Sequence, residues 1–195
     1  MIKPKIIPDT SSSKLVKPTA LNESLNNIVV VHLNKGDYDK ALEYYDKSLK
    51  IREELGDKYG MGYSLVNIGL VHYDKGEYNK AIEYLEKSLA IQKEIGFKVI
   101  ELFTTTYLYL SYRHLSRDYD EKHLRSLIKE TQNIEFDLNF RLYELLEESS
   151  YLETAYNQVQ EKVSAMEKEL AEKFLSYPLP KQIVEEWEKV SKVKN

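Results

Sequence analysis

The stretch NIGLVHYDKGEYNKAIEYLEKSLAIQKEIG, residues 67–96, decides the fold, because it repeats an earlier part of the chain. The earlier copy is NIVVVHLNKGDYDKALEYYDKSLKIREELG, residues 27–56. The copies align without a gap at an offset of 40 residues, and 17 of the 30 positions are identical. An internal match of this length indicates a duplicated supersecondary unit.

Each copy has the pattern of two helices joined by a tight turn. Leu65, Ile68 and His72 follow helical spacing before the turn Lys75-Gly76-Glu77. Glycine just past a helix end is free to take a positive φ. Small residues such as Gly69 allow the two helices to approach closely. Since one pair cannot bury its own apolar stripe, successive pairs are expected to stack into an antiparallel helix-pair solenoid.

The second copy resembles the tetratricopeptide repeat. The resemblance is carried by the pattern Asn67-Ile68-Gly69…Tyr73…Gly76-Glu77-Tyr78…Ala81-Ile82…Tyr84…Ser88-Leu89. The usual period is about 34 residues, whereas the offset here is 40 residues. The longer unit, which ends in residues 51–56 and 91–96, is similar to the extended repeats of kinesin light chains. The resemblance covers residues 22–100 and implies a scaffold that binds a protein or peptide partner.

The rest of the chain departs from this pattern. Residues 1–20 are rich in Lys, Pro and Ser and are predicted to form a disordered leader. The repeats are expected over residues 21–134, with a third, degenerate copy whose turn lacks glycine and which has Tyr109 in the place of Gly69. Residues 135–176 are predicted to form either a degenerate fourth pair or one long capping or coiled-coil helix. Residues 177–195 are expected to form a short terminal helix, which Pro180 can start. The predicted fold class is therefore all-α.

Composition limits the classes of function. The chain has 195 residues, a formal net charge of −4 and no cysteine, which excludes disulfides and thiolate metal sites. A mildly acidic chain without clustered Lys and Arg is not typical of a nucleic-acid-binding protein. The N-terminus lacks the apolar run of a signal peptide, and no stretch is long enough to cross a membrane. These features predict a cytoplasmic protein without nucleic-acid or membrane partners.

The resemblance implies that the first helix of each pair lines a concave face. On this chain that face is predicted to be an apolar and aromatic partner groove, suited to an amphipathic helix or an extended segment. The alternative is that these side chains pack against a neighbouring helix or against the chain's own C-terminal helix. The groove residues are Val30, Leu33, Tyr63, Val66, Leu70, Tyr73, Phe103, Leu110 and Arg113.

Chaperone-binding members of the same family hold a C-terminal carboxylate with a clamp of Lys, Asn and Arg side chains. The equivalent positions here are Asn26, Val30, Asn67, Phe103 and Tyr107, and only Asn67 matches. A carboxylate clamp needs cations for charge-assisted hydrogen bonds. The sequence therefore argues against a chaperone-tail site, and Asn67 is expected to be structural.

A second apolar pattern lies near the C-terminus. Six residues alternate steps of four and three, as in the seam of a coiled coil: Leu152, Tyr156, Val159, Val163, Met166 and Leu170. This helix is predicted either to cap the solenoid or to pair with a second copy in a homodimer. The segment 174–184 is similar to the junction that precedes class III nucleotide cyclase domains. The alternative function is thus a dimeric regulatory module of a cyclase- or kinase-linked signalling system.

No pattern of catalytic residues stands out in the sequence. His32 and His72 occupy the same place in consecutive repeats and are interpreted as packing residues rather than metal ligands. There is no glycine-rich phosphate loop after a strand pattern and no Gly-x-Ser-x-Gly. Carboxylates such as Glu83 pair with a lysine four residues on, as on a solvated helix face. The chain is predicted not to be an enzyme and to need neither a cofactor nor a metal.

Overall fold

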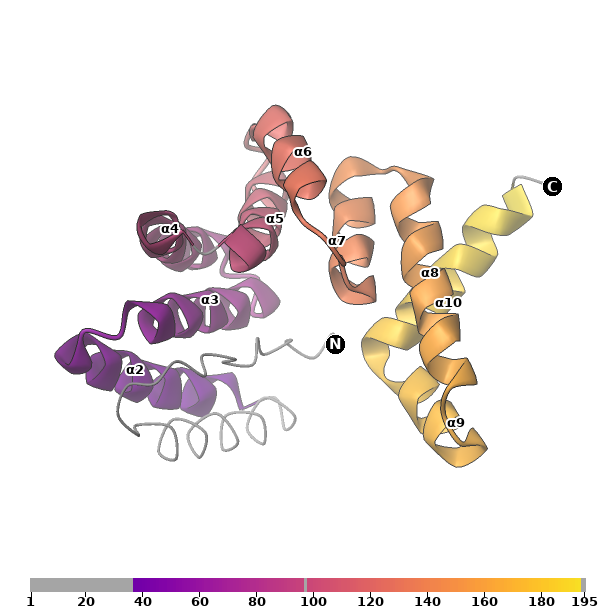
Figure 1. Cartoon of the computed structure of the whole chain (residues 1–195), viewed down its shortest axis with the longest axis horizontal. Helices are drawn as coiled ribbons and strands as arrows, with labels where there is room; N and C mark the ends of the chain where they lie inside the picture. The colour runs from indigo at the N-terminus through magenta and orange to yellow at the C-terminus, as the bar shows by residue number, and fades with distance from the viewer. Residues whose placement is uncertain (1–36, 97, 194–195) are drawn as a thin grey trace. The chain divides into compact units, whose positions relative to one another are not determined.

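The computed structural model describes residues 37–96 and 98–193, and all regular structure within those ranges is α-helical (Figure 1). The predicted all-α, helix-pair solenoid class is confirmed. The predicted leader and the residues Asn26, Val30, His32 and Leu33 lie outside the described ranges. The helices are α2 (Tyr38–Leu55), α3 (Lys58–Asp74), α4 (Tyr78–Ile95), α5 (Lys98–His114), α6 (Glu121–Glu130), α7 (Phe136–Leu146), α8 (Ser149–Ser164), α9 (Lys168–Ser176) and α10 (Pro178–Val193).

The chain divides into two compact units, whose described parts are residues 37–127 and residues 128–193. In the first unit α3 packs against both α2 and α4, and α4 packs in turn against α5. Tyr45 on α2 and Ile68 on α3 are buried together in its core. These contacts are those expected of helix pairs that stack on their neighbours.

Glycines end the helices where the repeat predicts a turn. Gly76 has a φ of +74°, and the N–H of Glu77 after it donates to the carbonyl oxygen of His72 at 2.9 Å. The predicted positive φ at Gly76 is confirmed. Gly56 and Gly96, which are 40 residues apart, cap α2 and α4 with φ values of +66° and +70°. The duplicated sequence therefore gives the same helix ends in both copies.

Buried polar side chains recur at the same offset. Ser48 and Ser88 are buried, and each accepts a hydrogen bond from the residue four positions later: from Nε of Arg52 at 3.2 Å and from Nε2 of Gln92 at 2.9 Å. Gln92 also donates to Oγ1 of Thr104 at 2.9 Å, which links α4 to α5. Since a buried polar group without a partner is costly, these bonds help to fix how one helix pair meets the next.

The third pair, α5 and α6, departs from the first two. Gly69 lies where α3 crosses α4, and a Cβ built on it would come within 2.8 Å of Cγ of Leu85. Tyr109 takes the equivalent place on α5 and is itself buried. The turn that follows, residues 115–120, contains Ser116 with a φ of +53°. Within the described chain, the backbones of α5 and α6 do not pack as closely as those of α3 and α4.

The second unit is built around α7, α8 and α10. Phe140, Leu152, Val159 and Ile183 are buried together in its core. Trp187 packs against this core and stacks on Tyr156, with 5.4 Å between ring centroids and an interplanar angle of 22°. Apolar side chains from three helices thus close this core.

Residues 135–176 were predicted to form either a degenerate fourth pair or one long helix, and residues 177–195 a short terminal helix. Residues 135–176 form α7, α8 and α9 rather than one long helix. Glu147 has a φ of +59° and ends α7, while the extended backbone of Glu167 separates α8 from α9. The terminal helix begins at Pro178, two residues before Pro180, because a proline at the first helical position loses no intrahelical hydrogen bond.

Candidate functional site

The predicted groove residues are mostly buried. On α3, Tyr63, Val66 and Leu70 are between 0% and 5% exposed, and on α5 Phe103 and Leu110 are 8% and 4% exposed. A partner cannot reach side chains this buried unless something moves away. Of the groove residues that the structure describes, Tyr73 is half-buried and Arg113 is exposed. These two lie near the C-terminal ends of α3 and α5, so the accessible part of the predicted groove is found there.

Aromatic rings gather at this end of the two helices. The ring of Tyr73 meets those of Tyr78, Tyr107 and His114 edge to face, with centroids 5.3–5.7 Å apart. His114 also stacks on Tyr78 at 4.2 Å, with an interplanar angle of 3°. The hydroxyl oxygen of Tyr73 lies 3.3 Å from Nε2 of His114. We call Tyr73, Tyr78, Tyr107 and His114 the aromatic cluster.

The turn between α3 and α4 positions this cluster. Asp74 is the last residue of α3, and Tyr78 is the first residue of α4. The left-handed Gly76 between them reverses the chain, which brings Tyr78 back beside Tyr73. Tyr107 and His114 come from the next helix, α5, and are seven residues apart. Two turns of an α-helix are close to seven residues, so both rings lie on the same side of α5.

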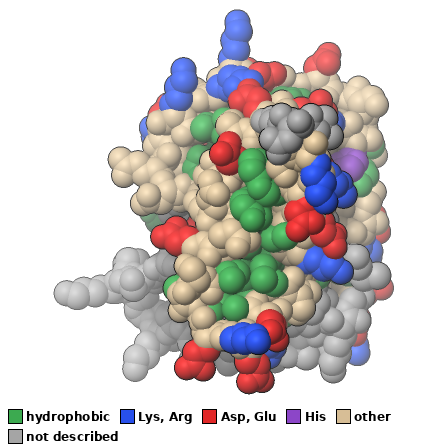
Figure 2. All heavy atoms as spheres, turned by 90° about the vertical axis from the view of Figure 1, so that its right-hand side faces the viewer, with side chains coloured by type: hydrophobic (Ala, Val, Ile, Leu, Met, Phe, Trp, Pro, Cys, Tyr) green, Lys and Arg blue, Asp and Glu red, His purple; other side chains and the backbone are tan. Residues whose placement is uncertain are grey.

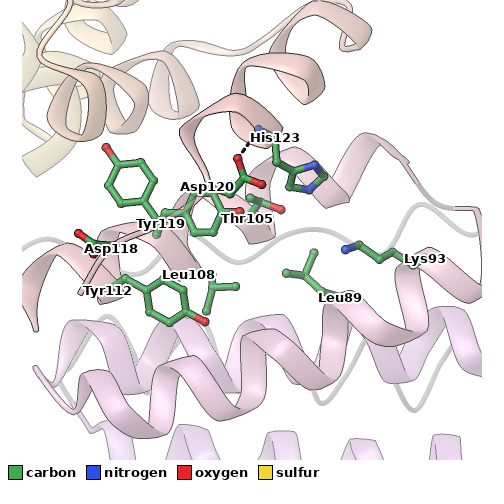
Figure 3. A pocket seen from close by; sticks show the side chains of 10 residues that line it. Leu89, Lys93, Thr105, Leu108, Tyr112, Asp118, Tyr119, Asp120 and His123 are labelled. Carbon is green, nitrogen blue, oxygen red and sulfur yellow. Dashed lines mark hydrogen bonds between the residues drawn. The ribbon is translucent and has the colours of Figure 1, made fainter.

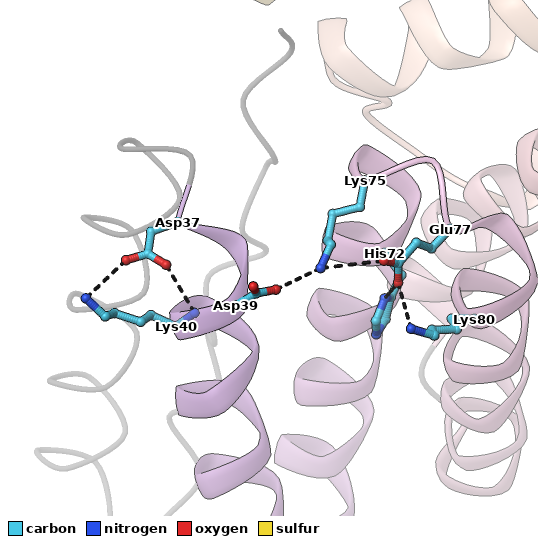
Figure 4. Close-up of polar contacts among 7 residues, drawn as sticks. All are labelled: Asp37, Asp39, Lys40, His72, Lys75, Glu77 and Lys80. Atoms are coloured by element: carbon cyan, nitrogen blue, oxygen red, sulfur yellow. Dashed lines mark hydrogen bonds and ion pairs between the residues drawn. The ribbon is translucent and has the colours of Figure 1, made fainter.

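Ionic contacts also hold this turn (Figure 4). Nδ1 of His72 lies 2.8 Å from Oε2 of Glu77, which also accepts a hydrogen bond from Nζ of Lys80 at 3.0 Å. Lys75 reaches Oδ1 of Asp39 on α2 at 2.8 Å and Oε1 of Glu77 at 3.6 Å. These contacts connect the turn to α2, α3 and α4.

The charge on Glu77 is favoured by these partners. The hydrogen bonds from Lys80 and from His72 lower the pKa of the Glu77 carboxyl to about 2, and the positive charge of Lys75 acts in the same direction. His72 is buried and stacks on Tyr84 at 5.4 Å with an interplanar angle of 13°. These contacts agree with the packing role that the repeat predicts for His72, with the added role of orienting Glu77.

The sequence missed the accessible aromatic cluster as a unit. Tyr73 was identified as a groove residue, whereas Tyr78 was noted only as part of the repeat pattern and His114 was not identified as a binding residue. The missing signal was the offset of seven between Tyr107 and His114 together with the turn at Gly76. Asn67 is 4% exposed, which agrees with the structural role expected of it rather than with a carboxylate clamp.

The predicted seam residues are divided among different elements. Leu152, Tyr156, Val159 and Val163 lie on α8, where Leu152 and Val159 are fully buried in the C-terminal core. Met166 lies between α8 and α9, and Leu170 on α9 is 56% exposed. Figure 2, turned so that the C-terminal helices face the viewer, shows apolar side chains between Lys/Arg and Asp/Glu side chains. Whether a second copy covers any of these side chains stays a prediction.

Residues 37–96 and 98–193 contain no group of three or more His, Asp or Glu side chains arranged to hold a metal ion. No helix in the same part of the chain combines the length and the apolar composition that crossing a membrane requires.

Stacked helix pairs with glycine-capped ends and an internal offset of 40 residues define an all-α repeat protein. Comparison with known families agrees, because residues 20–94 match the model of the tetratricopeptide repeat. This match supports the interpretation of the chain as a tetratricopeptide repeat protein. Neither the search of curated proteins nor that of solved structures found a match. Repeats of this family generally mediate protein–protein interactions, which supports a scaffold role. The likenesses to kinesin light chains and to the cyclase junction stay predictions.

Proposed function

We propose that the chain is a non-catalytic scaffold that binds a peptide or helix of a partner protein at the aromatic cluster. The main support for this proposal is the position of Tyr73, Tyr78 and His114. Their rings contact one another at the accessible C-terminal ends of α3 and α5. Tyrosine rings supply a large contact area at little cost in side-chain entropy, and they are enriched at binding hot spots. Arg113 adds an exposed cation on the same turn of α5 as His114.

The proposal narrows the predicted groove. Tyr63, Val66 and Leu70 support the helices from within, whereas Tyr73 is half-buried and Arg113 is exposed. A partner segment with an apolar or aromatic anchor suits rings that present both edges and faces. An acidic residue beside that anchor would suit Arg113.

The test is affinity capture with the full chain, followed by mass spectrometry. The double variant Arg113→Glu/His114→Ala changes two exposed side chains and leaves the buried residues of α3 intact. We expect it to lose the partners that the natural chain captures, while its helical content stays the same and its unfolding temperature falls only slightly, because the stacking of His114 on Tyr78 is lost. The control Lys50→Glu makes the same charge reversal on the exposed face of α2 and should retain those partners. Unchanged capture by the double variant would remove the aromatic cluster as the binding site.

A further inference from the structure

A pocket of about 500 Å³ lies between α4 and α5 and is bordered by the segment 118–123 (Figure 3). Its volume is within the range of small-molecule sites. Leu89 and Leu108 provide aliphatic walls, and Tyr109, Tyr112 and Tyr119 provide rings. The residues of α5 that line it are Thr105, Leu108, Tyr109 and Tyr112. By helical geometry they lie on a different side of α5 from Phe103, Leu110 and Arg113, so this pocket is separate from the proposed partner site.

The pocket follows from the departure of the third pair from the repeat. In the second pair Gly69 lets Leu85 pack directly against α3, with no room for even a Cβ. On α5 the equivalent residue is Tyr109, whose ring stands between two others. Its centroid is 6.0 Å from that of Tyr112 and 5.1 Å from that of Tyr119, with interplanar angles of 24° and 29°. The rings therefore occupy the place where a closely packed second helix would lie.

Thr105 is the residue that points to a ligand. It is 1% exposed and lines the pocket, yet its hydroxyl has no hydrogen-bond partner in the part of the chain that the structure describes. Its neighbours behave differently: Thr104 and Thr106 donate to carbonyl oxygens of their own helix at 2.9 Å and 2.8 Å. A buried hydroxyl without a partner reduces stability. Because this hydroxyl belongs to a residue of the pocket wall, a bound molecule reaches it once the side chains that cover it shift.

The charges around the pocket favour a cation. Asp118 lines it at the end opposite Lys93, and Asp120 lies between the two in this view (Figure 3). Oδ1 of Asp120 accepts the N–H of His123 at 2.9 Å, which keeps this carboxylate at the start of α6. Burial and the charge of Asp120 raise the pKa of Tyr109, so its ring stays neutral at ordinary pH. Neutral tyrosine rings beside carboxylates attract organic cations.

We propose that this pocket binds a small amphipathic organic cation. Its apolar body lies against Leu89, Leu108 and the tyrosine rings, and a polar group on that body hydrogen-bonds Oγ1 of Thr105. Its cationic group meets Asp118 and Asp120. Lys93 at the other side repels the cation and so sets one orientation of the ligand.

Three probes that share an indole ring test the proposal. Each is titrated into the full chain, and its binding is measured by calorimetry or NMR. Tryptamine carries a cation, tryptophol is neutral and indole-3-propionate carries an anion. We expect tryptamine to bind with a dissociation constant on the order of 1 mM, as its size allows. Tryptophol should bind about three- to tenfold more weakly, and indole-3-propionate more weakly still. Equal affinity for the three probes, or no saturable binding of tryptamine, would overturn the assignment.

Two variants separate the hydrogen bond from the charge. Thr105→Val has nearly the same shape and should weaken the binding of tryptamine and of tryptophol alike, by about three- to tenfold. Asp118→Asn/Asp120→Asn keeps a residue that can cap α6, and it should remove the preference for tryptamine over tryptophol.

Thr106→Val is the matched control, since its hydroxyl bonds Leu102 instead of lining the pocket. It should leave the affinity of all three probes unchanged. Thr105→Val loses no bond within the described chain, so it should unfold at a temperature no lower than that of the natural protein. If Thr105→Val remains folded and binds all three probes as the natural protein does, the site is wrong.

Discussion

At the scale of single residues, Glu77 joins more of the molecule than its position in a turn suggests. Its carboxylate meets His72 on α3, Lys80 on α4 and Lys75 in the turn, and Lys75 also bonds Asp39 on α2. Ion pairs on a surface are individually weak, but several charges that share one carboxylate restrain its geometry. The ends of α3 and α4 that carry Tyr73 and Tyr78 are thus held together by a carboxyl group that titrates.

This network predicts a specific response to acid. The folded state lowers the pKa of Glu77 from 4.5 to about 2, so the folded state favours the ionised form. The stability that Glu77 contributes is therefore fully present above the unfolded value of 4.5 and is lost as the pH falls from 4.5 toward about 2. Glu77→Gln should have a smaller fall in unfolding free energy between about pH 6 and about pH 3 than the natural protein, measured by urea denaturation. The same fall in both proteins would contradict this role, and Glu54→Gln is a control for the loss of one carboxylate.

Several residue roles could be predicted from the sequence, since they recur at the offset of 40. The roles of Gly76 and His72 were predicted correctly because an identical residue occupies the equivalent position in the other copy. Arg52 and Gln92 occupy equivalent positions in the two copies, and both are buried. Their shared role was missed because the two residues differ in type. Their shared feature is a hydrogen bond to a serine four residues earlier, and that serine is identical in both copies.

At the scale of helices, the crossing of α3 and α4 is the most closely packed junction in the first unit. α3 is buried along almost its whole length, from Gly60 to His72. Two glycines within it have different surroundings. A Cβ on Gly69 would lie 2.8 Å from Cγ and 2.9 Å from Cδ2 of Leu85, while a Cβ on Gly62 would have no neighbour closer than 3.9 Å.

The two glycines should respond in opposite directions to alanine. Gly69→Ala forces the buried Leu85 to move and should lower the unfolding free energy by about 1–3 kcal/mol. Gly62→Ala has room for the methyl group and gains helix propensity, so it should raise the unfolding free energy by up to about 1 kcal/mol. Chemical denaturation of the two variants side by side decides this. A destabilising Gly62→Ala, or a neutral Gly69→Ala, would contradict the packing described.

The breaks between helices were predicted where the sequence signals them and missed elsewhere. The break at Gly76 was expected, and α3 ends at Asp74 just before it. The break between α8 and α9 falls inside the regular heptad pattern, at Met166 and Glu167, where no glycine or proline occurs. Apolar spacing alone predicts which residues face a core. It does not show whether the helix continues between them.

At the scale of the whole molecule, the regularly spaced apolar residues near the C-terminus can pack either within the chain or against a second copy. This segment was expected either to cap the solenoid or to join two copies. Leu152 and Val159 are fully buried within their own unit, against Phe140 and Ile183. A seam between two copies would have to remove these side chains from that core. The internal use of the pattern is therefore the alternative that costs less free energy.

We accordingly expect the chain to sediment as a monomer over a wide range of concentration. Leu170 is the seam residue most exposed to solvent, at 56%, so Leu170→Asp should change neither the sedimentation coefficient nor the unfolding free energy. A natural chain that sediments as a dimer, together with a monomeric Leu170→Asp variant, would instead support the dimeric signalling module. Lys168→Asp, on the same helix and also exposed, is the control for the added charge.

The repeat class could be predicted from the duplication, whereas the accessibility of the groove could not. Burial depends on neighbours that are remote in sequence, and no pattern within α3 distinguishes a side chain in a groove from one in a core. Tyr63 and Tyr73 look alike in the repeat, yet the first is buried and the second is half-buried.

Trp187 is the only tryptophan in the chain, and it stacks on Tyr156 in the C-terminal unit. The tryptophan fluorescence of the protein therefore comes from the C-terminal unit alone. This fluorescence follows the packing of α8 against α10, whereas circular dichroism follows every helix. The separation between the two melting curves would measure directly how strongly the unfolding of one half depends on the other, with no label added.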